Sequence, residues 1–378
     1  MIIGLHTTSG RESGMKPQKE QNNGLIRKRL IFSFMMLSLT PIFMIGFLSY
    51  YYCQTAITRK ITRYSQAELM QTVANVQTKL AEFENTLVRL FINTEFNSAL
   101  TALGAANGET QFVAAKKGIE AQFKEYMISN QDIFGFMFMC EPNLDHSVLI
   151  TKDYYDEFTE LVRDFKEQNA YRNIMAAGGG IVWSSALKIN RSHFVLLGRQ
   201  IKETSTGDSL GILGIILDEE RIDQLINLNI YTRLYISLAE IGSYSLVINN
   251  DGEIVSTPFK EDIGKDFSKI IKETKPLDEI FSLVSNRDYG SEVNQGSFIT
   301  EVYERPTLVT FKTIGSKVGI GGKSGWHLLS LAPTSFLYAD VKRLAYATLG
   351  LGLIFAVVSV GISFYLTSLL DKKQTPLT

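Results

Sequence analysis

Two long apolar stretches constrain this chain more than any other feature of its sequence. Residues 30–52 and residues 344–370 contain no Asp, Glu, Lys or Arg, over 23 and 27 positions respectively. A helix of about 20 apolar residues is long enough to span the hydrocarbon layer of a membrane. Both stretches are therefore predicted to be transmembrane helices, and the sequence excludes a purely soluble protein.

The charges that flank the first apolar stretch predict how the chain is oriented. Residues 1–29 carry six basic and two acidic side chains, and the basic cluster 27–29 directly precedes the apolar run. Because cytoplasmic flanks of membrane helices are enriched in Lys and Arg, we expect a cytoplasmic N-terminus. The second membrane helix then returns residues 371–378 to the cytoplasm. The natural start is Met1 or Met15, an alternative that the sequence leaves open.

The residues between the two apolar stretches are predicted to form an extracytoplasmic domain. Subtracting the net +4 of residues 1–29 and the +1 of residues 371–378 from the total of −1 leaves −6 on residues 53–343. A mildly acidic domain is a poor binder of nucleic acid. Its length is sufficient for a buried core without disulfide bonds.

A long helix is expected directly after the first membrane helix. No Gly or Pro interrupts residues 54–92, and from Leu69 to Leu90 the apolar positions are separated by steps of 4, 3, 4, 3, 4 and 3. This heptad spacing keeps one apolar stripe on one side of a helix. We predict a stalk helix over residues 53–93. Its stripe packs along the chain's own domain, pairs with a second copy, or does both.

The rest of the external domain has the pattern of two α+β modules of unequal size. The larger module has helical patterns at 111–129, 154–168 and 219–228, and strand-like runs at 133–140, 146–151, 180–187, 193–201 and 209–217. The smaller module has a hairpin over 243–257, a polar helical stretch over 265–285, and strand-like runs at 296–303, 307–314 and 325–332. The predicted fold class is therefore α+β.

Sequence signatures of catalysis are missing. The four histidines are scattered without the H-E-x-x-H spacing of a zinc helix, and no G-x-S-x-G nucleophile motif occurs. The segment GIGGKSG at 319–325 is similar to a phosphate-binding loop, but Lys317 occupies the place of the required first glycine. We expect neither an enzyme nor a metal or cofactor site in this chain.

Three segments together resemble the double Cache sensor domains of bacterial transmembrane receptors. They are GRQIKETSTGDSLGILGIILDEERIDQLI (198–226), SLVINNDGEIVSTP (245–258) and GWHLLSLAPTSFLYADVKRL (325–344). The first is similar to the end of a membrane-distal Cache module, the second to the opening hairpin of a proximal module, and the third to its last strand and exit helix. The resemblance implies a stalk helix and two PAS-like modules between two membrane helices, with the distal module at 94–228 and the proximal module at 229–343.

The C-terminal segment TSLLDKKQTPLT (367–378) resembles the first turns of a HAMP linker, with Pro376 in the place of the family's proline. Two alternatives follow from this resemblance. Either the chain is the sensor half of a longer receptor, or the natural protein ends at residue 378. Among receptors with this type of input, Gram-positive sensor histidine kinases are the most similar.

The resemblance also implies a ligand site in the distal module. Amino-acid-binding Cache domains carry an Arg-x-Trp-Tyr helix, whereas the corresponding segment NAYRNIMAAGGGIVWSSA (169–186) has no Trp-Tyr pair. The family's strand Asp falls near Ile216, and these departures argue against recognition of an amino acid. The candidates that remain for a small polar ligand are Tyr154, Tyr171, Arg172, Trp183, Arg199 and Asp218.

These candidates combine aromatic surface with charge, which suits a small polar ligand. Four of them have alternative roles. Trp183 is also suited to core packing, Asp218 to capping the helix that follows it, and Arg172 to a solvated position on the surface. Arg199 lies in an apolar strand and requires either a structural carboxylate or a ligand anion as its partner.

The function expected from these features is that of a homodimeric transmembrane sensor in the cell membrane, as in two-component signal transduction. A small extracellular ligand binds the distal module, and the change passes through residues 333–345 and the second membrane helix to a cytoplasmic effector. A histidine kinase is the first expectation, but chemoreceptors, transcription regulators and diguanylate cyclases use the same input. The alternative is a membrane-anchored binding or scaffold protein that does not signal inward.

Overall fold

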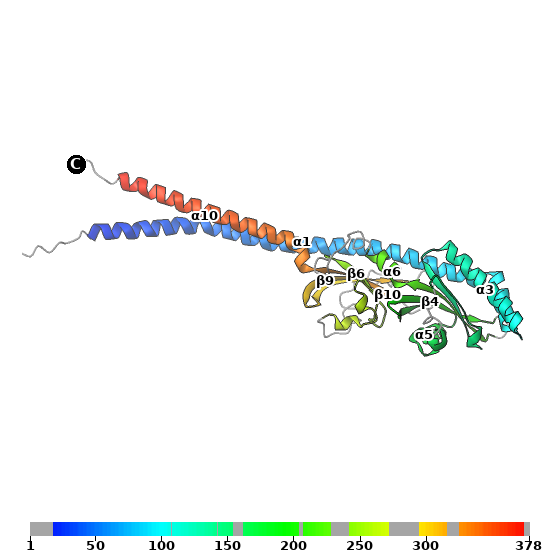
Figure 1. Ribbon diagram of the computed structural model, residues 1–378. Helices are drawn as coiled ribbons and strands as arrows, with labels where there is room; N and C mark the ends of the chain where they lie inside the picture. Colours follow the sequence, from blue (N-terminus) through cyan, green and yellow to red (C-terminus); the bar gives the residue numbers. More distant parts are fainter. Residues whose placement is uncertain are drawn as a thin grey trace, which may run out of the picture. The chain divides into compact units, whose positions relative to one another are not determined.

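The structure is a computed structural model, shown as a ribbon in Figure 1. It describes residues 18–106, 108–141, 143–153, 162–203, 207–227, 242–271, 295–315 and 325–373. The chain divides into two compact units. The first consists of Met1–Thr58 with Tyr338–Thr378, and the second of Arg59–Leu337.

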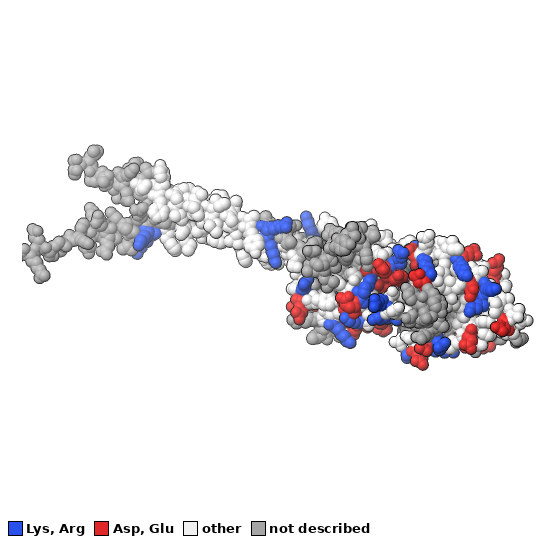
Figure 2. Space-filling view, in the orientation of Figure 1, with Lys and Arg blue, Asp and Glu red and all other residues white. Residues whose placement is uncertain are grey.

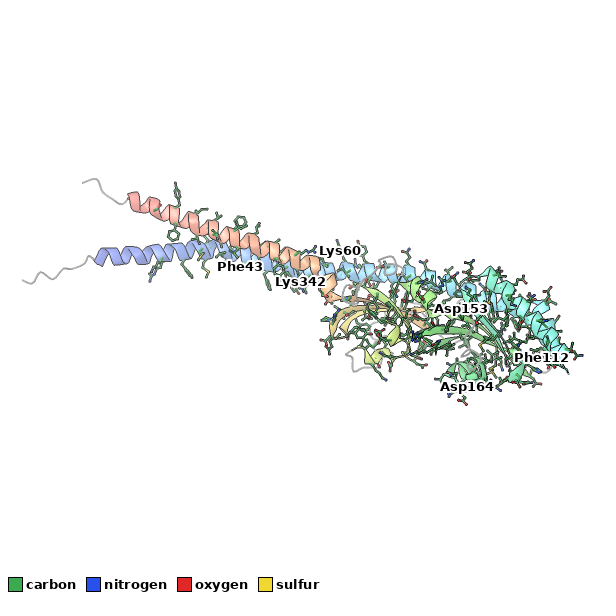
Figure 3. The ribbon with its side chains drawn as sticks, viewed as in Figure 1. Phe43, Lys60, Phe112, Asp153, Asp164 and Lys342 are labelled. Atoms are coloured by element: carbon green, nitrogen blue, oxygen red, sulfur yellow. The ribbon has the colours of Figure 1, made fainter. Side chains whose placement is uncertain are left out.

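The first unit is made of the N-terminal part of helix α1 (Gln18–Ile92) and the helix α10 (Ala339–Lys373). Apolar side chains on both helices face outward, such as Phe43, labelled in Figure 3, which is 66% exposed. Figure 2 shows few charged side chains over these helices and many over the second unit. Within the described residues, α1 and α10 are two helices long and apolar enough to cross a membrane.

The second unit contains two antiparallel five-stranded sheets. The first sheet has the spatial order β2-β1-β5-β4-β3. Its strands are β1 (Ile133–Cys140), β2 (Val148–Thr151), β3 (Ile181–Ile189), β4 (Ser192–Lys202) and β5 (Ser209–Asp218). All five strand-like runs of the larger module are confirmed. The run at 146–151 starts with the 3-10 turn η1 (Leu144–His146) and becomes a strand only at Val148.

The second sheet repeats the strand order of the first. Its spatial order is β7-β6-β10-β9-β8. Its strands are β6 (Tyr244–Ile248), β7 (Ile254–Ser256), β8 (Gln295–Val302), β9 (Arg305–Ile314) and β10 (Trp326–Pro333). Counted within each sheet, both orders are second, first, fifth, fourth, third. The structure thus has two PAS-like sheets behind one long helix, and the predicted α+β fold class is confirmed.

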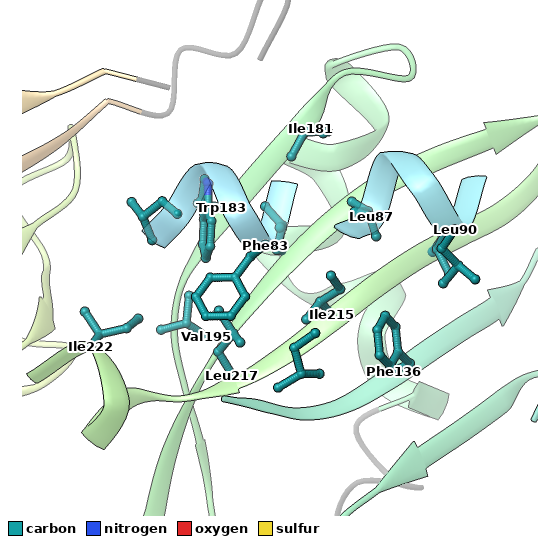
Figure 4. Packing of buried hydrophobic residues seen from close by; sticks show 14 of the residues in the cluster. Phe83, Leu87, Leu90, Phe136, Ile181, Trp183, Val195, Ile215, Leu217 and Ile222 are labelled. Atoms are coloured by element: carbon teal, nitrogen blue, oxygen red, sulfur yellow. The ribbon is translucent and has the colours of Figure 1, made fainter. Parts of the chain in front are cut away.

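One face of the first sheet is covered by α1, α2 (Thr94–Gly104) and α3 (Glu109–Ser129). The seven residues of the heptad stripe on α1 are all buried, with exposed fractions between 0 and 6%. In Figure 4 the stripe residues Phe83, Leu87 and Leu90 lie over side chains of the first sheet. The same core continues to the second sheet through Val247 and Leu328. The stripe therefore packs along the chain's own sheets, which is the first of the possibilities given above.

The opposite face of the first sheet packs against α5 (Asn169–Ala176) and the turn η2 (Phe165–Glu167). Because both faces are covered, the strands are almost continuously apolar instead of alternating with polar residues. Gly198 and Gly214 lie directly opposite each other on β4 and β5. A Cβ at Gly198 would come within 2.3 Å of Ile174 Cδ1, so this glycine lets α5 approach the sheet closely.

Some predicted features lie partly or wholly outside the described residues. They are residues 1–17, the first part of the helix at 154–168, most of the polar stretch at 265–285, the glycine-rich loop at 316–324 and the tail after Lys373. The described start of the polar stretch differs from the expectation, because it forms the 3-10 turn η4 (Phe267–Lys269), capped by Asp266, in place of an α-helix.

Candidate ligand-binding site

Trp183 lies in the core between the first sheet and α1. Its side chain is 6% exposed, and its indole Nε1–H donates a hydrogen bond to Glu84 Oε1 at 2.9 Å. The ring of Phe83 meets the indole edge-on, with 6.4 Å between centroids. Glu84 is itself buried, so the indole supplies a donor that a buried carboxylate requires. Core packing, the alternative role for this residue, is therefore what the structure shows.

Arg199 lies on the same face of the sheet, directly across from Ile181 on β3. Its guanidinium Cζ is 4.1 Å from the centroid of the Phe91 ring, which is a cation–π contact. Its Nε is buried and has no hydrogen-bond partner among the described residues. Burial also lowers the pKa of this arginine. The sequence suggested a carboxylate or a ligand anion as partner, and the structure instead places an aromatic ring there.

Tyr171 and Arg172 lie on α5, on the opposite side of the sheet from Trp183 and Arg199. The Tyr171 hydroxyl donates a hydrogen bond to Glu141, the residue that follows β1. This hydrogen bond, together with burial, raises the pKa of Tyr171 to about 12. Arg172 is exposed, and its guanidinium Nη2 donates a hydrogen bond to the carbonyl oxygen of Glu167 at 3.4 Å.

Asp218 is the N-cap of α6 (Glu219–Ile226), and its carboxylate accepts a hydrogen bond from the Glu220 amide at 3.0 Å. Tyr154 lies outside the described residues. The five described candidates thus occupy three places: the α1 side of the sheet, the α5 side, and the end of β5. The described structure does not bring them together in one pocket, and their role in ligand binding stays a prediction.

A different part of the larger module, beside the first sheet, forms a hollow of ligand size. Its volume is ≈ 610 Å³, and it lies beside the edge strand β2, within the range typical of small-molecule sites. Helix α3 lines one side of this hollow, and η1, β2 and residues 162–163 line the others. The rings of Phe112 on α3, labelled in Figure 3, and His146 in η1 stack with centroids 4.6 Å apart. This stacking packs α3 against η1, and other residues of both elements line the hollow.

Charged and apolar side chains both face this hollow beside β2. The cations are Lys116, Lys124 and Arg163, and the anions are Glu120 and Asp145. Among the described residues, none of the three cations forms an ion pair, although Lys116 Nζ lies 5.9 Å from the centroid of Phe112. Leu144, Leu149 and Ile150 supply the apolar surface.

Sequence reasoning missed this hollow. The signal available was the spacing of Lys116, Glu120 and Lys124, which are four residues apart and share one face of a helix. That pattern is also typical of an ordinary solvated helix face, and only the position of β2 shows what the face borders. Across the described residues, no group of three or more His, Cys, Asp or Glu is placed to hold a metal ion.

Comparison with known proteins gives similar solved structures but no sequence relatives. No family model and no curated protein matches the sequence. The ligand-binding domain of the Pseudomonas aeruginosa amino acid chemoreceptor PctB, in complex with L-Arg, is 12% identical, with a TM-score of 0.49 and coverage of 74% of this chain and 98% of that domain. The ligand-binding domain of the Pseudomonas fluorescens chemoreceptor CtaA, in complex with L-isoleucine, is 14% identical, with a TM-score of 0.47 and coverage of 76% and 98%.

The sensory domain of the Campylobacter jejuni chemoreceptor Tlp3, with isoleucine bound, is also similar. It is 12% identical, with a TM-score of 0.45 and coverage of 76% of this chain and 98% of that domain. These likenesses are of folds at low identity.

Proposed function

We propose that this chain is the membrane-anchored sensory part of a receptor, and that the hollow beside β2 binds a small ligand with at least one anionic group. The observation that carries the proposal is a ligand-sized hollow bordered by three cations that lack ion-pair partners among the described residues. A carboxylate or phosphate group would form charge-assisted hydrogen bonds with such side chains. Glu120 and Asp145 would accept hydrogen bonds from donor groups elsewhere on the ligand.

The path from the second sheet to the apolar helix α10 supports a sensory role. The last strand, β10, ends at Pro333, the short helix α9 (Thr334–Leu337) follows, and α10 begins at Ala339. The connection is too short to act as a flexible linker. A change in the sheet that ends in β10 would therefore be passed on to α10.

Ligand screening of the full chain in detergent tests the binding proposal. We would measure thermal unfolding with a panel of carboxylates, phosphates, amino acids, neutral polyols and amines. An anionic ligand at 100 times its Kd should stabilise the folded state by about 2.7 kcal/mol. The double variant Lys124→Gln, Arg163→Gln should remove most of this shift, because it removes two of the cations that border the hollow.

Lys117→Gln is the matched control, since Lys117 is an exposed residue of the same helix that does not line the hollow. Trp183→Phe and Arg199→Lys serve as tests of the site predicted from sequence. Binding that is lost in these two variants and kept in the double variant would place the ligand under α1 and overturn our assignment. If no compound in the panel shifts the unfolding temperature, the proposal of a small-ligand sensor fails altogether.

Sequencing beyond codon 378 separates inward signalling from simple binding. A reading frame that continues into a HAMP linker and an effector domain is expected for a sensor. A stop codon at that position would favour the membrane-anchored binding protein.

A further inference from the structure

The two sheets of the second unit meet at a joint built from side chains of both. Trp183 on β3 and Trp326 on β10 pack with 5.1 Å between ring centroids, and both are buried. They are the two tryptophans of the whole chain. Beside them, Asn249 after β6 donates a hydrogen bond from Nδ2 to the Ser185 hydroxyl of β3 at 2.9 Å.

Helix α6 leaves the first sheet directly from β5 and buries two carboxylates against the second sheet. Glu219 is 1% exposed and Asp223 is 0% exposed. Glu219 Oε1 accepts hydrogen bonds from the Ser256 hydroxyl at 2.7 Å and from the Thr257 amide at 3.2 Å. Burial raises the pKa of Glu219, although nearby Lys260 opposes the rise.

One ammonium group is shared between the two buried carboxylates. Lys260, in the turn η3 (Lys260–Asp262), places Nζ 2.6 Å from Glu219 Oε2 and 2.8 Å from Asp223 Oδ2. Removing two carboxylates from water is costly, and the geometry here supplies each of them with several donors. Buried ionic networks of this kind add little net stability, but they are satisfied in only one arrangement of their elements.

The C-terminal end of α6 is fastened to the second sheet as well. The Asn227 side chain accepts a hydrogen bond from the Ser245 amide at 2.7 Å and donates to the Ser245 carbonyl at 2.8 Å. Its Nδ2 also donates to Asp223 Oδ1 at 2.7 Å. The amide group thus pairs with β6 as a neighbouring strand would. Both ends of α6 are therefore held by the second sheet, while its N-cap remains the last residue of β5.

We infer that α6, with the network of Glu219, Asp223, Asn227 and Lys260, is the coupling element that makes the two modules respond as one body. In this arrangement a displacement of β5 carries α6 with it, and α6 carries β6 and the segment around Ser256. The Trp183–Trp326 contact and the core that α1 shares with both sheets are the other points of attachment between the modules. This coupling is independent of which compound binds the hollow beside β2.

The test is pulsed hydrogen exchange of the full chain in detergent over a urea series, with peptides from each sheet followed separately. In the natural chain we expect peptides of both sheets to lose protection at the same urea concentration, since coupled modules unfold in one transition. The neutral variant Glu219→Gln, Asp223→Asn, Lys260→Met should separate the two midpoints. Tryptophan fluorescence, which reports the joint itself, should then change at the lower of the two.

A control variant removes an ion pair that lies within one module. Lys79 Nζ on α1 is 2.8 Å from Asp132 Oδ2, beside the first sheet, so Lys79→Met with Asp132→Asn should leave the two midpoints coincident. If the triple variant does not fold, Asn227→Ala provides the same comparison with every charge retained. Coincident midpoints in a folded triple variant, or in Asn227→Ala where the triple variant does not fold, would overturn the inference. Two separate midpoints in the natural chain would also overturn it.

Discussion

At the scale of single residues, distant partners decide the role of each candidate. Trp183 is of a residue type that often contacts ligands. Its indole instead donates a hydrogen bond to Glu84, which is 99 positions away in the sequence. Arg199 rests on Phe91, and Asp218 caps the helix that follows it. Local sequence separates these roles only for Asp218, because a helix cap depends on the next few residues alone.

Gly198 gives a prediction at this scale. A methyl group there would meet Ile174 Cδ1 at 2.3 Å, so Gly198→Ala should destabilise the protein by about 1–3 kcal/mol through overpacking. Ile174→Val removes that Cδ1 atom, and the double variant should therefore lose less stability than the sum of the single changes. Urea unfolding followed by tryptophan fluorescence measures each free energy.

Gly104→Ala is the matched control, since a methyl group at Gly104 would meet no atom within 4 Å. Its stability should be unchanged or slightly higher, because alanine is the better helix former. A Gly198→Ala variant as stable as the natural chain would contradict the close approach of α5 to the sheet.

At the scale of elements, α1 shows how one pattern serves two alternatives. Its heptad stripe predicts a helix with one apolar side, and in the structure that side packs against the chain's own sheets. The outward side carries exposed residues such as Ala67 and Ala74, one heptad apart. The homodimer expected from the sequence, if it uses α1, must therefore pair through this outward side and not through the stripe.

Disulfide cross-linking tests this pairing. In a Cys53→Ser background, Ala67→Cys and Ala74→Cys should each cross-link two copies in the membrane, because two chains confined to one membrane meet at high effective concentration. Val73→Cys and Val76→Cys should not cross-link, since both positions are buried within the chain. Absence of cross-linking at both exposed positions would count against a dimer through α1 and favour an anchored monomer.

At the scale of the whole molecule, the two apolar helices and their flanking charges predict which parts of the chain lie on each side of a membrane. The basic cluster at 27–29 predicts the N-terminus in the cytoplasm. A membrane-impermeant maleimide applied to intact cells should therefore label Asn250→Cys, in the turn after β6, and should label Asn22→Cys only after permeabilisation. Cys53→Ser is again the background, and labelling of Asn22→Cys alone in intact cells would reverse the predicted orientation.

Local patterns in the sequence predicted most elements of this protein and their kind, with the start of the polar stretch at 265–285 as an exception. Two uncharged runs predict the membrane helices, heptad spacing predicts the long helix, and apolar runs bounded by turn residues predict the strands. These signals can be recognised in a single sequence because each depends only on neighbours within a few residues. The resemblance to double Cache domains then predicted the two modules that the sheets display.

Which neighbours those elements pack against depends on contacts between distant parts of the chain. Only the pairing of strands far apart in the chain gives the order β2-β1-β5-β4-β3 and its repeat in the second sheet. The direction of the α1 stripe, the hollow beside β2, and the Lys260 bridge to Glu219 and Asp223 depend on the same pairings. The residues in these contacts are 37 to 99 positions apart in the sequence, so the contacts produce no local periodicity. Close packing and the pairing of buried charges determine which residues meet.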